Sequence, residues 1–168
     1  MKFFGNFSRI TWVKSINILR KSLCDDGKKV IYCRRCMSFE TDGYFDTARQ
    51  SLTDAGIDWQ SVVKIHLTPV QAMLQIPEID KSVFYDCGFE FILDGRGYKP
   101  SNVKCELSQK NILLLAERRL SFGMISLIKL YPNFQREWDQ SSADCCMSSE
   151  GIIVVKGNWK SSPADLLP

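Results

Sequence analysis

The residues with the clearest capacity for chemistry are the cysteines of the segment Cys33-Arg34-Arg35-Cys36. Two thiolates at this spacing can form half of a tetrahedral zinc site, and the arginines between them favour the thiolate form. A structural zinc needs four ligands, however, and no second pair of this kind follows. The other cysteines have no diagnostic spacing and are Cys24, Cys87, Cys105, Cys145 and Cys146. Cys33 and Cys36 are therefore weak zinc candidates, and we expect no cofactor.

The sequence contains no clear motif of a catalytic site. A thioredoxin-like redox site needs a helix directly after the cysteine pair, and residues 37–43 have no helical pattern. A hydrolase of the Ser/Cys–His type would have to use His66, the only histidine, and no G-x-S-x-G frame surrounds any nucleophile. We therefore favour a protein that is not an enzyme.

The positive charge is concentrated at the N-terminal end. The chain has 22 Lys and Arg against 19 Asp and Glu, a net charge of +3. Residues 1–35 carry nine cations and two acids, a local +7, so the remaining 133 residues carry −4. A basic end of this kind is compatible with nucleic-acid binding. The residues that would contact phosphates are Arg9, Lys14, Lys21, Lys28, Arg34 and Arg35. The alternative is a solvated helix face on an acidic body.

Polar, partly acidic segments that also carry an aromatic residue are the candidate partner-binding sites. They contain Asp42, Tyr44, Trp138, Asp139 and Asp144. Aromatic residues dominate the binding energy of many protein interfaces. Without a catalytic motif, this pattern favours a protein-binding module whose partner is another protein. The concrete hypothesis is a small bacterial immunity or antitoxin-type inhibitor that blocks a toxin domain. The alternative is a nucleic-acid-associated protein, with or without a zinc knuckle at Cys33 and Cys36.

Cysteine usage and the N-terminal sequence predict a cytoplasmic protein with reduced thiols. Seven cysteines are too few for a disulfide scaffold, and polar residues interrupt the first positions before a signal-peptide core can form. The longest nearly apolar segment, residues 121–131, contains Lys129 and is too short to cross a bilayer. We therefore expect no membrane span.

Hydrophobic periodicity predicts a mixture of helices and strands. Helices are expected over 8–23 and 44–55, from Thr68 to before Pro77, and over 108–120. Strands are expected over 30–33, 63–67 and 152–155, with a hairpin inside 83–108. Residues 124–130 fit a strand or a continued helix, and 133–150 resemble a loop. The predicted fold class is α+β: a single globular domain over 1–160, with a mostly antiparallel sheet, three to four packed helices and a frayed tail over 161–168.

Overall fold

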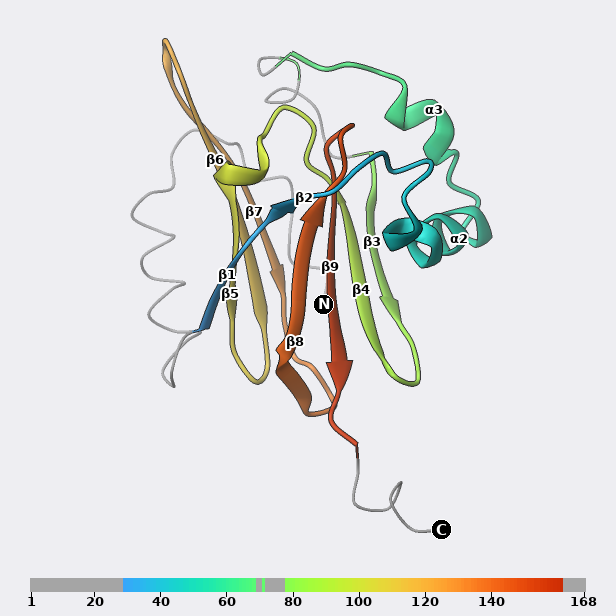
Figure 1. Cartoon of the computed structure of the whole chain (residues 1–168). Helices are drawn as coiled ribbons and strands as arrows, with labels where there is room; N and C mark the ends of the chain where they lie inside the picture. The colour runs from blue at the N-terminus through green and yellow to red at the C-terminus, as the bar shows by residue number, and fades with distance from the viewer. Residues whose placement is uncertain (1–28, 69–70, 72–77, 162–168) are drawn as a thin grey trace, which may run out of the picture.

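The computed structural model describes residues 29–68, 71 and 78–161, and these form two β-sheets packed face to face (Figure 1). In sheet A the strands lie in the order β1 (Lys29–Tyr32), β5 (Val103–Leu107), β6 (Ile112–Leu120) and β7 (Gly123–Tyr131). In sheet B the order is β2 (Arg34–Arg35), β8 (Trp138–Met147), β9 (Ile152–Trp159), β4 (Gly88–Asp94) and β3 (Asp80–Phe84). Every pair is antiparallel except β2 and β8.

The helical elements of the described chain are short. They are η1 (Gly43–Phe45), α2 (Asp46–Asp54), α3 (Trp59–Val63) and η2 (Pro100–Asn102). Figure 1 shows α2 and α3 on the sheet B side of the molecule. The predicted α+β fold with three to four helices on a single sheet was therefore wrong: the described chain is a β-sandwich, and its two α-helices have nine and five residues.

The main hydrophobic core lies between the two sheets. Because side chains alternate along a strand, every second residue of each strand points into this space. The Phe91 ring of β4 stacks on the Tyr131 ring of β7 with centroids 3.8 Å apart, which joins sheet B to sheet A. Gly157 in β9 admits the Phe89 ring, since a Cβ there would lie 2.4 Å from the ring.

A second hydrophobic core covers the outer face of sheet B. Phe45, Leu52 and Trp59, from η1, α2 and α3, pack against Ile92 and Val154 of the sheet. The N-terminus of η1 is capped by Asp42, whose carboxylate accepts a hydrogen bond from the Tyr44 N–H. The sequence between β2 and β3 thus covers one outer face of the sandwich with its own helices.

Several predicted elements are confirmed. The helix expected over 44–55 is η1 followed by α2, and the strands expected over 30–33 and 152–155 are β1 and β9. Residues 124–130, which fitted either a strand or a continued helix, form β7. The expected hairpin inside 83–108 is wrong in its pairing: β4 and β5 are both strands but belong to different sheets, and β4 pairs with β3 instead. The helix over 8–23 and residues 69–70 and 72–77 of the next predicted helix lie outside the described residues, as do 162–168 of the expected tail.

Three other predictions were wrong, the first two because tertiary pairing overrides local preference. Residues 112–120 form β6, not a helix, since they pair with β5 on one side and β7 on the other. Residues 138–147, expected as loop, form β8 between β2 and β9. Residues 63–67, expected as a strand, contain only the end of α3 and irregular chain.

Candidate functional site

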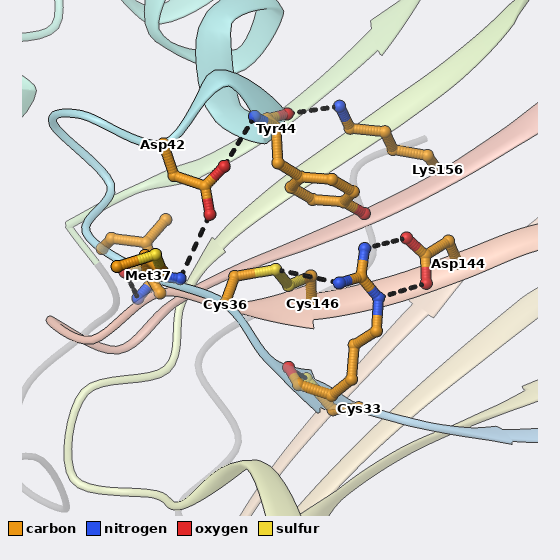
Figure 2. The surroundings of a disulfide bond; sticks show 11 residues. Cys33, Cys36, Met37, Asp42, Tyr44, Asp144, Cys146 and Lys156 are labelled. Carbon is orange, nitrogen blue, oxygen red and sulfur yellow. Dashed lines mark hydrogen bonds and ion pairs between the residues drawn. A yellow bond between two sulfur atoms is a disulfide. The ribbon is translucent and has the colours of Figure 1, made fainter.

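A disulfide joins Cys36 to Cys146, and several of the candidate residues predicted from the sequence lie around it (Figure 2). Cys36 follows β2 and Cys146 belongs to β8. The Cys36 N–H donates to the Met147 carbonyl at 2.9 Å, which extends the β2–β8 pairing by one residue. The two cysteines are 110 residues apart in the sequence, with Cα atoms 5.9 Å apart. The bond therefore fastens the short β2 strand to the body of sheet B. Our expectation of reduced thiols was wrong for this pair.

An ion pair lies directly beside the disulfide. The Arg34 guanidinium donates to both carboxylate oxygens of Asp144, at 3.1 and 2.8 Å, and its third nitrogen lies 3.3 Å from the Cys36 sulfur. The hydrogen bonds from Arg34 lower the pKa of Asp144 below its ordinary value. Because the Arg34 side chain is 52% exposed, the pair contributes little to stability by itself.

The Tyr44 ring lies between two cations. The Arg34 guanidinium carbon is 4.9 Å from the ring centroid and the Lys156 ammonium is 4.1 Å from it. Lys156 also donates to the Tyr44 carbonyl at 2.6 Å and forms an ion pair with Glu90 at 3.1 Å. Burial raises the pKa of Tyr44. These contacts join η1 to strands β4 and β9.

Glu90 is a buried carboxylate whose partners all come from neighbouring elements. Its oxygens accept hydrogen bonds from the Thr47 hydroxyl of α2 at 3.0 Å and from the Tyr85 hydroxyl at 2.9 Å. With Lys156 as the ionic partner, the charge is compensated. Such a satisfied network fixes the position of α2 on the sheet.

The free thiols of Cys33, Cys145 and Cys105 lie in the other core, between the sheets. Cys145 and Cys146 are adjacent, so strand alternation sends one side chain to each face of sheet B. A hydrogen bond with Cys145 and burial raise the pKa of Cys33 far above its ordinary value. The weak zinc candidates Cys33 and Cys36 cannot form a knuckle in this structure, because Cys36 is disulfide-bonded and the two side chains lie in different cores. Among the described residues, no group of three His, Cys, Asp or Glu is arranged to hold a metal ion.

The predicted partner-binding residues do not form one exposed surface. Asp42 accepts from the Met37 and Tyr44 N–H groups, and Asp144 binds Arg34 (Figure 2). Trp138 is fully buried, and its indole N–H donates to the Ser108 carbonyl at 3.0 Å. Asp139 accepts from the N–H and hydroxyl of Ser141 in the irregular part of β8. Asp42, Tyr44 and Asp144 are thus brought together as structural contacts, whereas Trp138 belongs to the core.

The predicted nucleic-acid residues are only partly described. Arg9, Lys14, Lys21 and Lys28 lie outside the described residues. Arg34 and Arg35 are exposed on β2, and Arg34 is paired with Asp144. No helix in the part of the chain that the structure describes is long and apolar enough to cross a membrane.

An apolar surface on sheet A was missed by the sequence reasoning. Two cross-strand rows point away from the sandwich: Tyr32–Lys104–Leu115–Ile128 and Val30–Glu106–Leu113–Leu130. Tyr32 is 74% exposed, and Val30 and Ile128 are also exposed, as are Met124 further along β7 and Phe122 in the β6–β7 turn. We call these two rows, with Met124 and Phe122, the outer face of sheet A. The sequence did not reveal this surface because β6 and β7 carry apolar residues on both faces. Hydrophobic and polar residues therefore do not alternate clearly along these strands.

No protein-family model and no curated protein matches the sequence. Solved structures with a similar arrangement include stress-induced protein 1 from Caenorhabditis elegans, with 15% identity over 53% of this chain and 68% of that one and a TM-score of 0.42. A small heat-shock protein from Xylella fastidiosa has 11% identity over 52% of this chain and 89% of that one, with a TM-score of 0.43. The rat alpha crystallin domain has 17% identity over 56% of this chain and 96% of that one, with a TM-score of 0.38. Identities and scores this low do not assign this chain to a family.

The two predicted functions are corrected by these findings. The similar solved structures named here are stress or small heat-shock proteins and a crystallin domain, and none is an immunity protein, an antitoxin or a nucleic-acid binder. The prediction of an immunity or antitoxin-type toxin inhibitor was wrong, and so was the nucleic-acid alternative. The geometry agrees with this correction. The acidic residues predicted to bind a basic partner, Asp144, Asp42 and Asp139, already accept hydrogen bonds from groups of this chain.

Proposed function

We propose that this protein binds another polypeptide, and that the outer face of sheet A takes up an amphipathic helix of that partner. The observation that carries the proposal is the clustering of exposed apolar residues. Of the eight large hydrophobic residues exposed in the described chain, five lie on this face: Val30, Tyr32, Phe122, Met124 and Ile128. Contiguous apolar patches of this kind mark interaction sites on soluble domains.

The same molecule shows how such a face is covered. The outer face of sheet B also carries apolar residues, and α2 and α3 pack on it. The outer face of sheet A has four strands, so its width is about 14 Å from three spacings of about 4.8 Å. One α-helix, about 10 Å across, fits this width. A helix is therefore the occupant that the geometry favours.

The two rows carry one positive and one negative side chain. Lys104 and Glu106 lie two residues apart on β5, in neighbouring rows, and form an ion pair at 3.8 Å, so they compensate each other within the rows. Recognition would then depend on apolar contact by the exposed side chains, with Tyr32 and Ile128 at opposite margins of the face, because Leu113 and Leu115 at its centre are already buried. A partner helix needs leucine-type residues at three- and four-residue steps.

The test uses an 18-residue Leu/Lys peptide with one apolar helical face and a scrambled peptide of the same composition. Binding is measured by fluorescence anisotropy of labelled peptide and by NMR shifts of the protein. We expect the amphipathic peptide to bind and to shift the resonances of β6 and β7, and the scrambled peptide to bind at least tenfold more weakly.

Matched methionines provide the control. Met124→Lys places a charge on the proposed surface and should weaken binding at least tenfold. Met37 is 75% exposed but lies beyond β2 on the sheet B side, so Met37→Lys should leave the affinity unchanged. Equal weakening by both variants, or equal binding of the scrambled peptide, would contradict the proposal.

A further inference from the structure

A cavity of about 390 Å³ opens where segments from both sheets and the chain after α3 meet. Its walls come from the end of β2, residues 63–67, the loop 96–100, and the turn 147–151 between β8 and β9, together with Arg118 of β6. None of the exposed residues that define the outer face of sheet A lines it, so it is a separate feature. Its size is within the range of small-molecule sites.

The base of the cavity is built around a buried arginine. The Arg96 guanidinium binds both oxygens of Asp94, at 2.9 and 2.8 Å, and donates to the Val62 and Ile65 carbonyls at 2.7 and 3.0 Å. Its charge is therefore compensated, and it holds the segment after α3 in place. Gly151 has a φ of +98° and lies against Arg96, where a Cβ would come within 3.0 Å of the backbone. The cavity thus has a fixed, preorganised wall.

Three further cations line the cavity without a carboxylate partner in the described chain: Arg35, Lys99 and Arg118. Arg118 donates one N–H to the Gly97 carbonyl at 2.7 Å, and the guanidinium has four more donors. The lining acid is Glu150, whose oxygens accept from the Ser38 hydroxyl and the Phe39 N–H at 2.7 and 2.8 Å. The cavity therefore carries three positive charges against one negative charge that is already hydrogen-bonded.

The hydrogen bonds to Glu150 also keep it ionised. Burial raises the pKa of this carboxyl, but the hydrogen bonds that it accepts, the strongest from Phe39 and Ser38, together outweigh burial and lower the pKa below its ordinary value. One side of the cavity is apolar, with Val63 and Met147 buried and Ile65 half-exposed. A ligand that fits both features has an anionic group and an apolar group.

We propose that this cavity binds a small organic phosphate monoester with an apolar substituent. A phosphate monoester carries close to two negative charges at neutral pH, which matches the excess of two positive charges. Guanidinium groups bind phosphate oxygens through paired N–H donors, and Arg35 and Arg118 supply two such groups. The apolar substituent lies against Val63 and Ile65.

The experiment is a calorimetric titration of the full chain with phenyl phosphate, inorganic phosphate, benzoate and phenol. We expect phenyl phosphate to bind most tightly, inorganic phosphate and benzoate at least tenfold more weakly, and phenol not measurably. Equal affinity for phenyl phosphate and inorganic phosphate would overturn the role of the apolar wall. Binding of phenol as tight as that of phenyl phosphate would overturn the role of the cations.

Neighbouring arginines on β6 provide the matched variants. Arg118 lines the cavity, whereas Arg119 is exposed and points to the opposite face of sheet A. Arg118→Gln should weaken phenyl phosphate binding about tenfold or more, and Arg119→Gln should not change it. Because Arg118 also contacts Gly97, Lys99→Gln at an exposed position gives a second variant with the same expected loss. Equal effects of the Arg118 and Arg119 variants, or no effect of the Lys99 variant, would overturn the proposal.

Discussion

The two outer faces of the sandwich have similar apolar strands but different covers. On sheet B, Ile92, Ile152 and Val154 are fully buried under the segment that contains α2 and α3. On sheet A, Tyr32 and Ile128 remain exposed. An apolar sheet face is thus a core in one case, and in the other it carries the exposed residues on which our binding proposal rests. Among the described residues, the helical cover lies on sheet B, and it comes from the segment between β2 and β3.

The two faces also differ in their polar contacts. The covered face contains the Cys36–Cys146 disulfide and the buried Glu90 network, which fix β2 and α2 on the sheet. On the outer face of sheet A, the ion pair between described residues is Lys104–Glu106, within one strand. Fixed polar contacts thus accompany the helical cover of sheet B.

The largest expected difference between the faces is in stability. Phe45→Ala removes a fully buried ring from the covered face of sheet B and should lower the free energy of unfolding by about 3–5 kcal/mol. Ile128→Ala on the outer face of sheet A, where the residue is 38% exposed, should lower it by less than about 1.5 kcal/mol. Urea unfolding followed by circular dichroism measures both. Equal losses would mean that the outer face of sheet A is as permanently covered as that of sheet B.

The disulfide should be the next largest contribution on the covered face. Cys36→Ser opens a loop of 110 residues and should lower the free energy of unfolding by about 2–4 kcal/mol. Dithiothreitol should destabilise the wild-type protein by a similar amount and leave the variant unchanged. Cys87→Ser, at an exposed free cysteine, is the control and should have no effect. A variant as stable as the wild type in the absence of reductant would show that β2 is held without the disulfide.

Low pH should destabilise the elements packed on the outer face of sheet B, because two carboxyl groups there become protonated. The pKa values of Asp144 and Glu150 are lowered in the folded protein, by Arg34 for the first and, against the effect of burial, by Phe39 and Ser38 for the second. Groups with a lowered pKa stabilise the fold above their ordinary values, near 4, and this stability is lost as the pH falls further.

Unfolding measured between pH 7 and pH 2 tests this expectation. Asp144→Asn should cost less than about 1 kcal/mol at pH 7, because Arg34 is largely exposed, and should flatten the profile below pH 4. Glu117→Gln, at an exposed position on the outward side of β6, should leave the profile unchanged. A profile for Asp144→Asn identical to that of the wild type would show that the Arg34–Asp144 pair does not couple to folding.

Much of the local structure on the covered face was predictable. Phe45, Ala48 and Leu52 recur at helical spacing before Gly56, and this segment is η1 and α2. The run 152–155 is β-branched and apolar, and it is a central strand. In both cases the residues that decide the element lie within it, so the pattern is visible without knowledge of the rest of the chain.

The strands of sheet A and β8 were less predictable, for two physical reasons. Residues 112–120 are rich in Leu, Glu and Arg, which favour helix, and only pairing with β5 and β7 makes them a strand. Residues 138–147 are polar on one side and carry adjacent cysteines, so they resemble a loop until β2 and β9 pair with them. Contacts distant in the sequence decided both elements.

By itself the sequence determined the helical spacing of Phe45, Ala48 and Leu52, the β-branched run over 152–155, and the apolar content of the strands. It also placed Cys36 and Arg34 close together, because they are neighbours in the chain. Only the tertiary structure decided that Cys36 bonds to Cys146, that Arg34 meets Asp144, and that helices cover sheet B. The reason is that local sequence sets side-chain direction within an element, whereas pairing and cover depend on residues about a hundred positions away.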